Sequence, residues 1–205
     1  MPANTNNYGE NGASSIPPSK FGGNVDNRRI GKGTTMYYTV EVAGAKIMVS
    51  DTHAAQGDSE LSGTAMETSM TTKLKVTLHK QGALPAMVQN LTYPLMETDD
   101  HFVISGFALT DYLSQLTTPG DVFSAGASVD LALENCFNNT RHFIMKTYEL
   151  SEPETIALMG ESPYHILCFL SKYVHKYRYI CMLVYIQHMP CIYIYDVYSS
   201  FASHN

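Results

Sequence analysis

Apolar and polar residues alternate most clearly between Met70 and Lys80. Leu74, Val76 and Leu78 occupy every second position there, and the residues between them are Lys and Thr. Side chains of a β-strand point alternately to its two faces, so this spacing predicts a strand with three aliphatic side chains on a buried face. We expect Val76 to lie at the centre of that face, and the other elements between residues 36 and 160 to pack against it.

Further strands are predicted by runs of β-branched and aromatic residues. Residues 36–42 and 45–50 form two such runs joined at Ala43-Gly44, which indicates a hairpin. Residues 101–109 are a mostly apolar run of strand length, which is typical of a central strand. Residues 141–150 are interpreted as another strand.

Helices are predicted in three places. Within residues 127–137, apolar side chains recur at three- and four-residue spacing. Residues 110–116 can form a short capped helix, and Ser151 with Glu154 makes a capping box for a short helix that ends at residue 160. Helices and strands that mix without strict alternation predict an α+β fold, with a single, mostly antiparallel sheet and short helices on one face.

Composition divides the chain into three parts. Residues 1–33 are rich in Asn, Gly, Ser and Pro, which predicts a disordered N-terminal arm. Residues 34–160 contain the predicted elements and form one globular α+β domain. Residues 161–205 hold eight of the 14 tyrosines and have neither a helical nor a strand period, so we expect an irregular aromatic and apolar tail of uncertain structure.

The tail raises the question of a membrane anchor. Residues 179–198 have the length of a spanning helix, but Gln187, His188 and Pro190 fall near the middle, where polar groups are costly. The N-terminus lacks the apolar segment of a secretory signal. We therefore expect a cytoplasmic protein, and the alternative is a tail-anchored one that contacts the membrane only through residues 179–198.

The charge distribution disfavours nucleic acid as a partner. The net charge is −6, and residues 36–163 carry 16 acidic and six basic residues. Such an acidic region repels phosphate. The four cysteines contain no C-x-x-C pair and so indicate neither a disulfide framework nor a zinc site. We expect no cofactor.

One short stretch resembles a known metal-binding motif. Residues 46–53, KIMVSDTH, resemble the opening motif of calcineurin-like metallophosphoesterases, in which a strand delivers an Asp-x-His pair to a two-metal centre. The resemblance implies that Asp51 and His53 are metal ligands. The later Gly-Asn-His and Gly-His-x-His motifs of that family have no counterpart here. A solvated polar cluster at the end of a strand is the simpler interpretation, and no catalytic residue is assigned.

Asp99-Asp100-His101 is the other cluster with metal-ligating side chains. Adjacent residues of an extended segment point in opposite directions, so the three side chains cannot easily converge on one ion. A turn before a strand is the better interpretation.

A second resemblance covers more of the chain. A basic strand, a turn at Gln81-Gly82, an apolar strand ending at Gly106 and a helix at residues 130–136 resemble the C-terminal half of cypovirus polyhedrins. That resemblance implies a capsule protein that assembles into crystals. We therefore predict a non-enzymatic binding or self-assembling structural protein that contacts another protein or a second copy of itself. The alternative is a metal-dependent phosphoesterase fragment that uses Asp51-Thr52-His53.

Overall fold

The structure is a computed structural model, and it describes residues 17–58, 60, 62–80, 82–110, 129–161, 169–171, 181–187 and 197–200. Its elements, in chain order, are β1 (Thr35–Tyr37), β2 (His53–Ala55), β3 (Met66–Glu67), β4 (Thr71–Leu74), the 3-10 helix η1 (Ala86–Val88), β5 (Leu95–Glu97), β6 (His101–Phe107), α3 (Val129–Tyr148), α4 (Glu152–Glu161), β7 (Phe169–Ser171), β8 (Cys181–Gln187) and β9 (Val197–Ser200). The predicted α+β class is confirmed.

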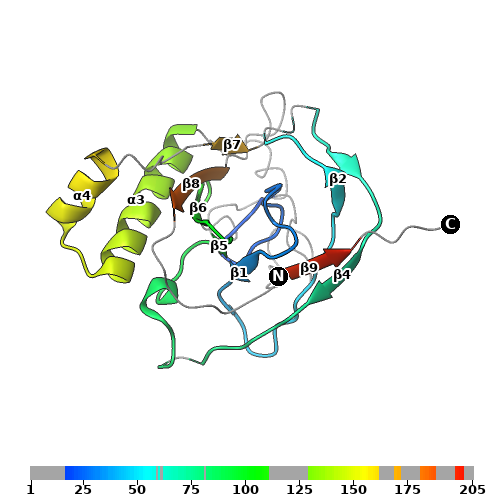
Figure 1. Cartoon of the computed structure of the whole chain (residues 1–205), viewed down its shortest axis with the longest axis horizontal. Helices are drawn as coiled ribbons and strands as arrows, with labels where there is room; N and C mark the ends of the chain where they lie inside the picture. The colour runs from blue at the N-terminus through cyan, green and yellow to red at the C-terminus, as the bar shows by residue number, and fades with distance from the viewer. Residues whose placement is uncertain are drawn as a thin grey trace, which may run out of the picture.

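Among the described residues, five strands form the main sheet, in the order β1-β5-β6-β8-β7, and every pair within it is antiparallel. Two separate antiparallel ribbons pair β2 with β3 and β4 with β9. Figure 1 shows α3 and α4 on one side of the molecule and the β2 and β4 ribbons on the opposite side. The strands are thus divided among three sheets, where the sequence pattern predicted one.

The core lies between β6 and α3. Residues 102–107 of β6 are all buried, as expected for a central strand. The Phe102 ring packs on Phe143 of α3, with ring centroids 5.1 Å apart. Gly106 lets the helix approach closely, because a Cβ built there would lie only 2.4 Å from Cys136 Cβ. The main sheet and α3 therefore form two layers whose spacing depends on a glycine.

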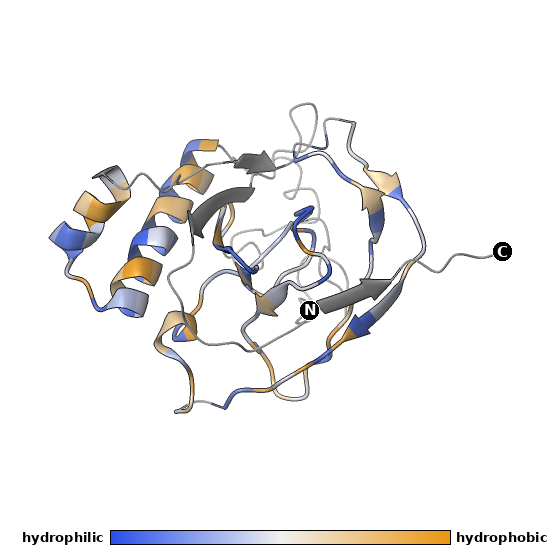
Figure 2. Ribbon diagram, in the orientation of Figure 1, coloured by the Kyte–Doolittle hydropathy of each residue, from blue (hydrophilic) through white to orange (hydrophobic). Residues whose placement is uncertain are grey.

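The helix α3 is longer than predicted. It continues through residues 141–148, where the sequence analysis expected a strand, and that prediction is wrong. Its buried stripe keeps the helical spacing to its C-terminal half, and Figure 2 shows hydrophobic and hydrophilic residues interleaved along it. The stripe consists of Ala132, Cys136, Asn139, Thr140, Phe143 and Ile144. Two of these residues, Asn139 and Thr140, are polar, so the helical period cannot be recognised there from apolar residues alone.

The capping box before α4 is confirmed. Ser151 Oγ bonds the Glu154 carboxylate, and the Ser151 backbone N–H donates to the same Glu154 Oε2 at 2.9 Å. These bonds hold the pKa of Glu154 below its usual value. The cap therefore fixes where α4 begins after the end of α3.

The stretch with the clearest alternation is not the centre of the core. Only residues 71–74 form a strand, β4, and it pairs with β9 outside the main sheet. Val76 and Leu78 are 63% and 69% exposed. The predicted burial of Val76 is therefore wrong, because alternation marks a face suited to burial without providing a layer that covers it.

The predicted hairpin over residues 36–50 is also absent. Its first residues belong to β1, which pairs with β5 in the register Met36↔Met96. Residues 38–50 contain no strand, although a turn with a hydrogen bond from Ala45 N to the Val42 carbonyl occurs where the hairpin turn was expected. The strand β5, and not residues 45–50, is thus the pairing partner of residues 35–37.

Both ends of the chain differ from the prediction where the structure describes them. Residues 17–33 are not a free arm but a series of turns, in which Val25 joins the hydrophobic core. The C-terminal part contributes strands to the sheet, whereas an irregular tail was expected. Residues 1–16, and the helix predicted at residues 110–116 except for Thr110, lie outside the described residues. Among the described residues, no helix is both long and apolar enough to cross a membrane.

Candidate functional site

The β2–β3 ribbon brings a histidine and a carboxylate to one face. His53 is the register partner of Glu67, and directly opposite residues of an antiparallel pair project to the same side. Thr52 and Thr68 fasten the start of the ribbon, because Thr68 N donates to the Thr52 carbonyl (3.0 Å) and Thr52 Oγ1 donates to the Thr68 carbonyl (2.5 Å). The ribbon therefore sets the distance between His53 and Glu67.

Asp51 completes this group from the segment before β2. His53 Nε2 lies 3.2 Å from Asp51 Oδ1 and 3.1 Å from Glu67 Oε2. The imidazole side chain is 11% exposed, whereas the two carboxylate side chains are 55% and 52% exposed. A recessed imidazole nitrogen thus faces two carboxylates that solvent can reach.

Glu67 is held by its other oxygen. Thr64 Oγ1 donates to Glu67 Oε1 at 2.9 Å, and Ala65 N donates to it at 3.3 Å. The Thr64 bond is the main reason why the pKa of Glu67 lies below its usual value, and His53 adds to the effect. The carboxylate is therefore ionised and oriented, with Oε2 directed at the imidazole.

A second pair of carboxylates approaches the same histidine. Ligand atoms of Asp26, His53 and Glu60 lie within 4.8 Å of one another, as do those of Asp51, His53 and Glu67. Asp26, Asp51 and Glu60 have φ values of 47°, 64° and 39°. Left-handed backbone is uncommon outside glycine, and such outliers gather at functional sites. Three of them around one histidine support a functional role for this region.

The environment of His53 favours its protonated form in the absence of a cation. Burial acts against the charged imidazole and lowers its pKa, but the hydrogen bond with Gln56 and the charges of Asp51 and Glu67 outweigh that effect. The His53 pKa therefore lies above its ordinary value of 6.5. A bound proton and a bound cation would compete for the same nitrogen.

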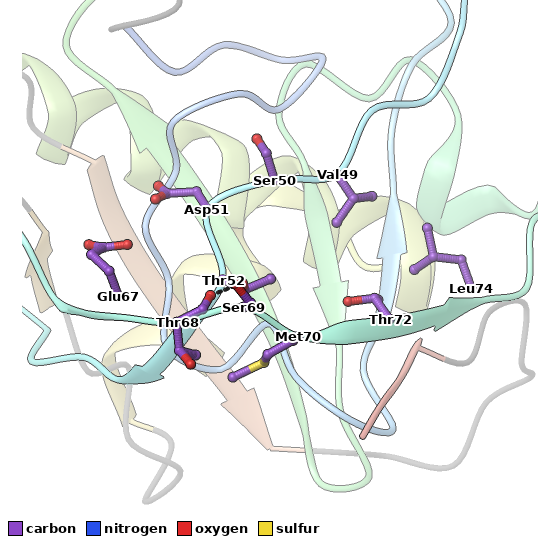
Figure 3. Close-up of a pocket in the computed structure, with 10 residues that line it drawn as sticks. All are labelled: Val49, Ser50, Asp51, Thr52, Glu67, Thr68, Ser69, Met70, Thr72 and Leu74. Atoms are coloured by element: carbon purple, nitrogen blue, oxygen red, sulfur yellow. Dashed lines mark hydrogen bonds between the residues drawn. The ribbon is translucent and has the colours of Figure 1, made fainter. Parts of the chain in front are cut away.

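A pocket of about 780 Å³ adjoins the group. Figure 3 shows the Asp51 and Glu67 carboxylates at one end of it and the aliphatic side chains of Val49 and Leu74 at the other. Met70 adds a further apolar side chain to the lining. The pocket thus offers a negatively charged end and an apolar end, and its volume lies within the range of small-molecule sites.

The donor atoms suit a divalent cation. One imidazole nitrogen and two carboxylate oxygens within 4.8 Å of one another make a mixed nitrogen and oxygen set. Imidazole ligands favour Zn²⁺, and carboxylates bind both Zn²⁺ and Mn²⁺. The half-exposed carboxylates leave room for water or a substrate beside such an ion.

The structure brings together the two residues that the sequence singled out, Asp51 and His53, and their role as ligands stays a prediction. It adds Glu67, which the sequence analysis missed because 13 residues separate it from His53 and only the register joins them. Asp100 and His101 form a separate ion pair at 2.6 Å in the turn before β6. That pair has the location the sequence predicted.

Comparison with known proteins relates the chain to neither metallophosphoesterases nor polyhedrins, but to a third family. The model of the acetamidase/formamidase family matches residues 1–162. A formamidase of Methylophilus methylotrophus is 26% identical over 157 residues, which are 74% of this chain and 36% of that protein. An acetamidase of Mycolicibacterium smegmatis is 40% identical over 50 residues, which are 24% of this chain and 12% of that protein. The matched part of the chain thus spans about a third or less of these relatives.

This match overturns both functional hypotheses. The prediction of a non-enzymatic, self-assembling structural protein is wrong, and so is the phosphoesterase alternative. The metallophosphoesterase resemblance rested on eight residues and the polyhedrin resemblance on the order of a few elements, whereas the family model spans more than three quarters of the sequence. The chain belongs to the acetamidase/formamidase family.

Proposed function

We propose that this chain contains the amide-hydrolysing site of an acetamidase/formamidase, built by Asp51, His53 and Glu67 around a divalent cation. The observation that supports it best is the pair of distances from His53 Nε2 to the two carboxylates, 3.2 Å and 3.1 Å, at the edge of a pocket. Among the described residues, this group combines an imidazole nitrogen and carboxylate oxygens that could hold a cation with direct access to a pocket that could hold a substrate.

The substrate we propose is a short aliphatic amide. The relatives are described as a formamidase and an acetamidase, and both names denote amides with at most one carbon beyond the carbonyl. The apolar end of the pocket, with Val49 and Leu74, suits a small alkyl group, while the carboxylate end suits the polar amide. A substrate lying along the pocket would have its carbonyl near Asp51 and Glu67.

Hydrolysis consumes one water and yields a carboxylic acid and ammonia. The oxygen of water forms a bond to the carbonyl carbon, the carbon–nitrogen bond breaks, and the proton lost by water is returned to the leaving nitrogen. Asp51 and Glu67 both line the pocket, but Glu67 Oε1 already accepts bonds from Thr64 and Ala65, so Asp51 is the carboxylate better placed to carry this proton. A bound cation would supply Lewis-acid polarisation of the amide carbonyl.

The proposal is tested by measuring ammonia release from formamide and acetamide. The full chain is stripped of metal, loaded with Zn²⁺ or Mn²⁺, and compared with its Asp51→Asn variant. We expect Asp51→Asn to lower the rate at least about 100-fold, the scale on which a proton-transfer group contributes. The matched control is Asp100→Asn, which removes another exposed Asp beside a His, 2.6 Å from its partner but outside the site.

Wild-type activity that falls in Asp51→Asn and persists in Asp100→Asn would support the assignment. No ammonia from the metal-loaded wild-type chain, or an equal rate in Asp51→Asn, would refute it. Circular dichroism on all variants ensures that a lost rate is not a lost fold.

A further inference from the structure

The side-chain amide of Gln56 has only one orientation that satisfies its neighbours. Gln56 Nε2 lies 2.6 Å from the backbone carbonyl oxygen of Asp26. A carbonyl oxygen can only accept a hydrogen bond, so the atom facing it must be the amide nitrogen. The flipped amide would set two acceptor oxygens against each other. Gln56 Oε1 therefore points the other way, toward His53.

The orientation of Gln56 in turn determines the proton on His53. Gln56 Oε1 lies 3.2 Å from His53 Nδ1, and a carboxamide oxygen accepts but does not donate. The bond exists only if Nδ1 carries a hydrogen. In the neutral imidazole, Nε2 then keeps its lone pair, and this is the nitrogen that faces Asp51 and Glu67 at 3.2 Å and 3.1 Å.

We propose that Gln56 is a positioning residue of this site, which fixes His53 in the tautomer whose Nε2 is free to bind a cation. Histidine ligands are commonly oriented by a hydrogen bond on the opposite ring nitrogen, and losing it weakens the site. The inference rests on the proposed function for its consequence in amide hydrolysis, but the hydrogen-bond relay from Asp26 through Gln56 to His53 stands on geometry alone.

A second set of contacts holds the two loops that carry this relay. Arg28 Nε and Arg29 Nη1 lie 2.9 Å and 3.0 Å from the same oxygen, Asp58 Oδ1. Asp58 is two residues beyond Gln56, and Arg28 is two residues beyond Asp26. The ion pairs therefore tie together the segments that supply the acceptor and the amide. The ion pairs thus hold the segment of Asp26 next to Gln56, and Gln56 contacts the His53 imidazole.

The experiment uses two substitutions of Gln56 and one control in the full chain. Gln56→Leu keeps the size of the side chain but removes both hydrogen-bonding groups. Gln56→Glu keeps an acceptor for Nδ1–H and loses the donor to Asp26. The control is Gln89→Leu, at an exposed glutamine whose Nε2 donates to the Leu84 carbonyl at 3.1 Å in a similar local bond.

Two readouts separate positioning from support of the fold. Long-range proton–nitrogen NMR of histidine-labelled protein reports which ring nitrogen of His53 is protonated, with its signal assigned by its loss in His53→Asn. Calorimetric titration with Zn²⁺ reports the affinity of the site. Gln56→Leu should abolish the preference for Nδ1–H and weaken Zn²⁺ binding by about 10- to 100-fold. Gln56→Glu should keep the tautomer and bind Zn²⁺ more tightly than Gln56→Leu, and Gln89→Leu should match the wild type.

The proposal is overturned if the neutral imidazole of wild-type His53, recorded at a pH above its raised pKa, carries its hydrogen on Nε2, or if Gln56→Leu binds Zn²⁺ as the wild type does. It is also overturned if Gln56→Glu and Gln56→Leu lose affinity equally and in parallel with their melting temperatures, because that is the result of a purely structural role. The wild-type tautomer decides the matter if Gln56→Leu does not fold. None of these readouts requires amide turnover, so a chain that binds Zn²⁺ as expected but releases no ammonia refutes the proposed function and leaves this inference intact.

Discussion

Adding one methyl group to Gly106 should separate the two layers of the core. An alanine Cβ at this position would lie 2.4 Å from both Cys136 Cβ and Cys136 N, and 2.5 Å from the Ala132 carbonyl oxygen. Two of these atoms are backbone atoms of α3, so no change of rotamer relieves the overlap. The helix must move away from β6, and its packing on Ile104 and its neighbours must loosen.

The expected cost is at the upper end of overpacking, about 3 kcal/mol. For a chain of this size that corresponds to a fall in melting temperature of roughly 6–12 °C. Thermal unfolding followed by circular dichroism measures it. The control is Gly160→Ala in α4, where no atom lies within 4 Å of the added Cβ. That variant should gain up to about 1 kcal/mol, because alanine favours helix over glycine. Equal melting of Gly106→Ala and wild type would refute the arrangement of α3 on β6.

Three further outcomes test the fold. Asn139→Ala removes the 2.8 Å hydrogen bond from Asn139 Nδ2 to the Ser105 carbonyl, and should cost about 1–3 kcal/mol in urea unfolding. Ser151 hydrogen bonds lower the pKa of Glu154, so the stability that this carboxylate contributes is present above its unfolded pKa and is lost as pH falls through the folded value. An NMR titration should return the Glu154 pKa to its ordinary value in Ser151→Ala. Val76→Asp should change stability by no more than about 0.5 kcal/mol, because Val76 is 63% exposed, and unfolding would show that the side chain is buried after all.

The sequence predicted the buried central strand but placed the centre of the core elsewhere, around Val76, which is exposed. An unbroken apolar run identified β6, because a strand covered on both faces needs no polar alternation. The same approach ended α3 too early, at Phe137, since Asn139 and Thr140 interrupt the apolar stripe. Both are buried and hydrogen-bonded, Asn139 to β6 and Thr140 to the Cys136 carbonyl. Polar side chains whose hydrogen bonds are satisfied within the protein can thus belong to the buried face of a helix, although a hydrophobicity pattern does not count them.

Alternation proved a poor guide to burial in the β-rich segments. Leu74, Val76 and Leu78 have the pattern of a half-buried strand, yet all three are exposed. Which strand pairs with which is decided by the tertiary fold, and Tyr37 pairs with Leu95, which is far away in the sequence. Local sequence patterns cannot show whether a strand pairs with its neighbour in a hairpin or with the edge of a distant strand.

That the chain binds another protein or a second copy of itself stays a prediction.

The candidate site could be predicted only in part for a related reason. Asp51 and His53 are two residues apart, so sequence spacing alone brought them to attention. Glu67 reaches His53 through strand register, and Asp26 through a turn in a segment expected to be disordered. The one local signal for a larger site was the number of polar ligand types between residues 51 and 60, of which the sequence analysis considered only Asp51 and His53.

The central claim is that His53 and its carboxylates form a cation-dependent amide-hydrolysing site. The most direct measurement is the rate of ammonia release from formamide while Zn²⁺ is titrated into the metal-stripped chain. The account predicts a negligible rate without metal, a rise in proportion to added Zn²⁺, and saturation at one equivalent for each chain. Equal activity in the metal-stripped and the Zn²⁺-loaded chain, or no ammonia at saturation, would contradict it.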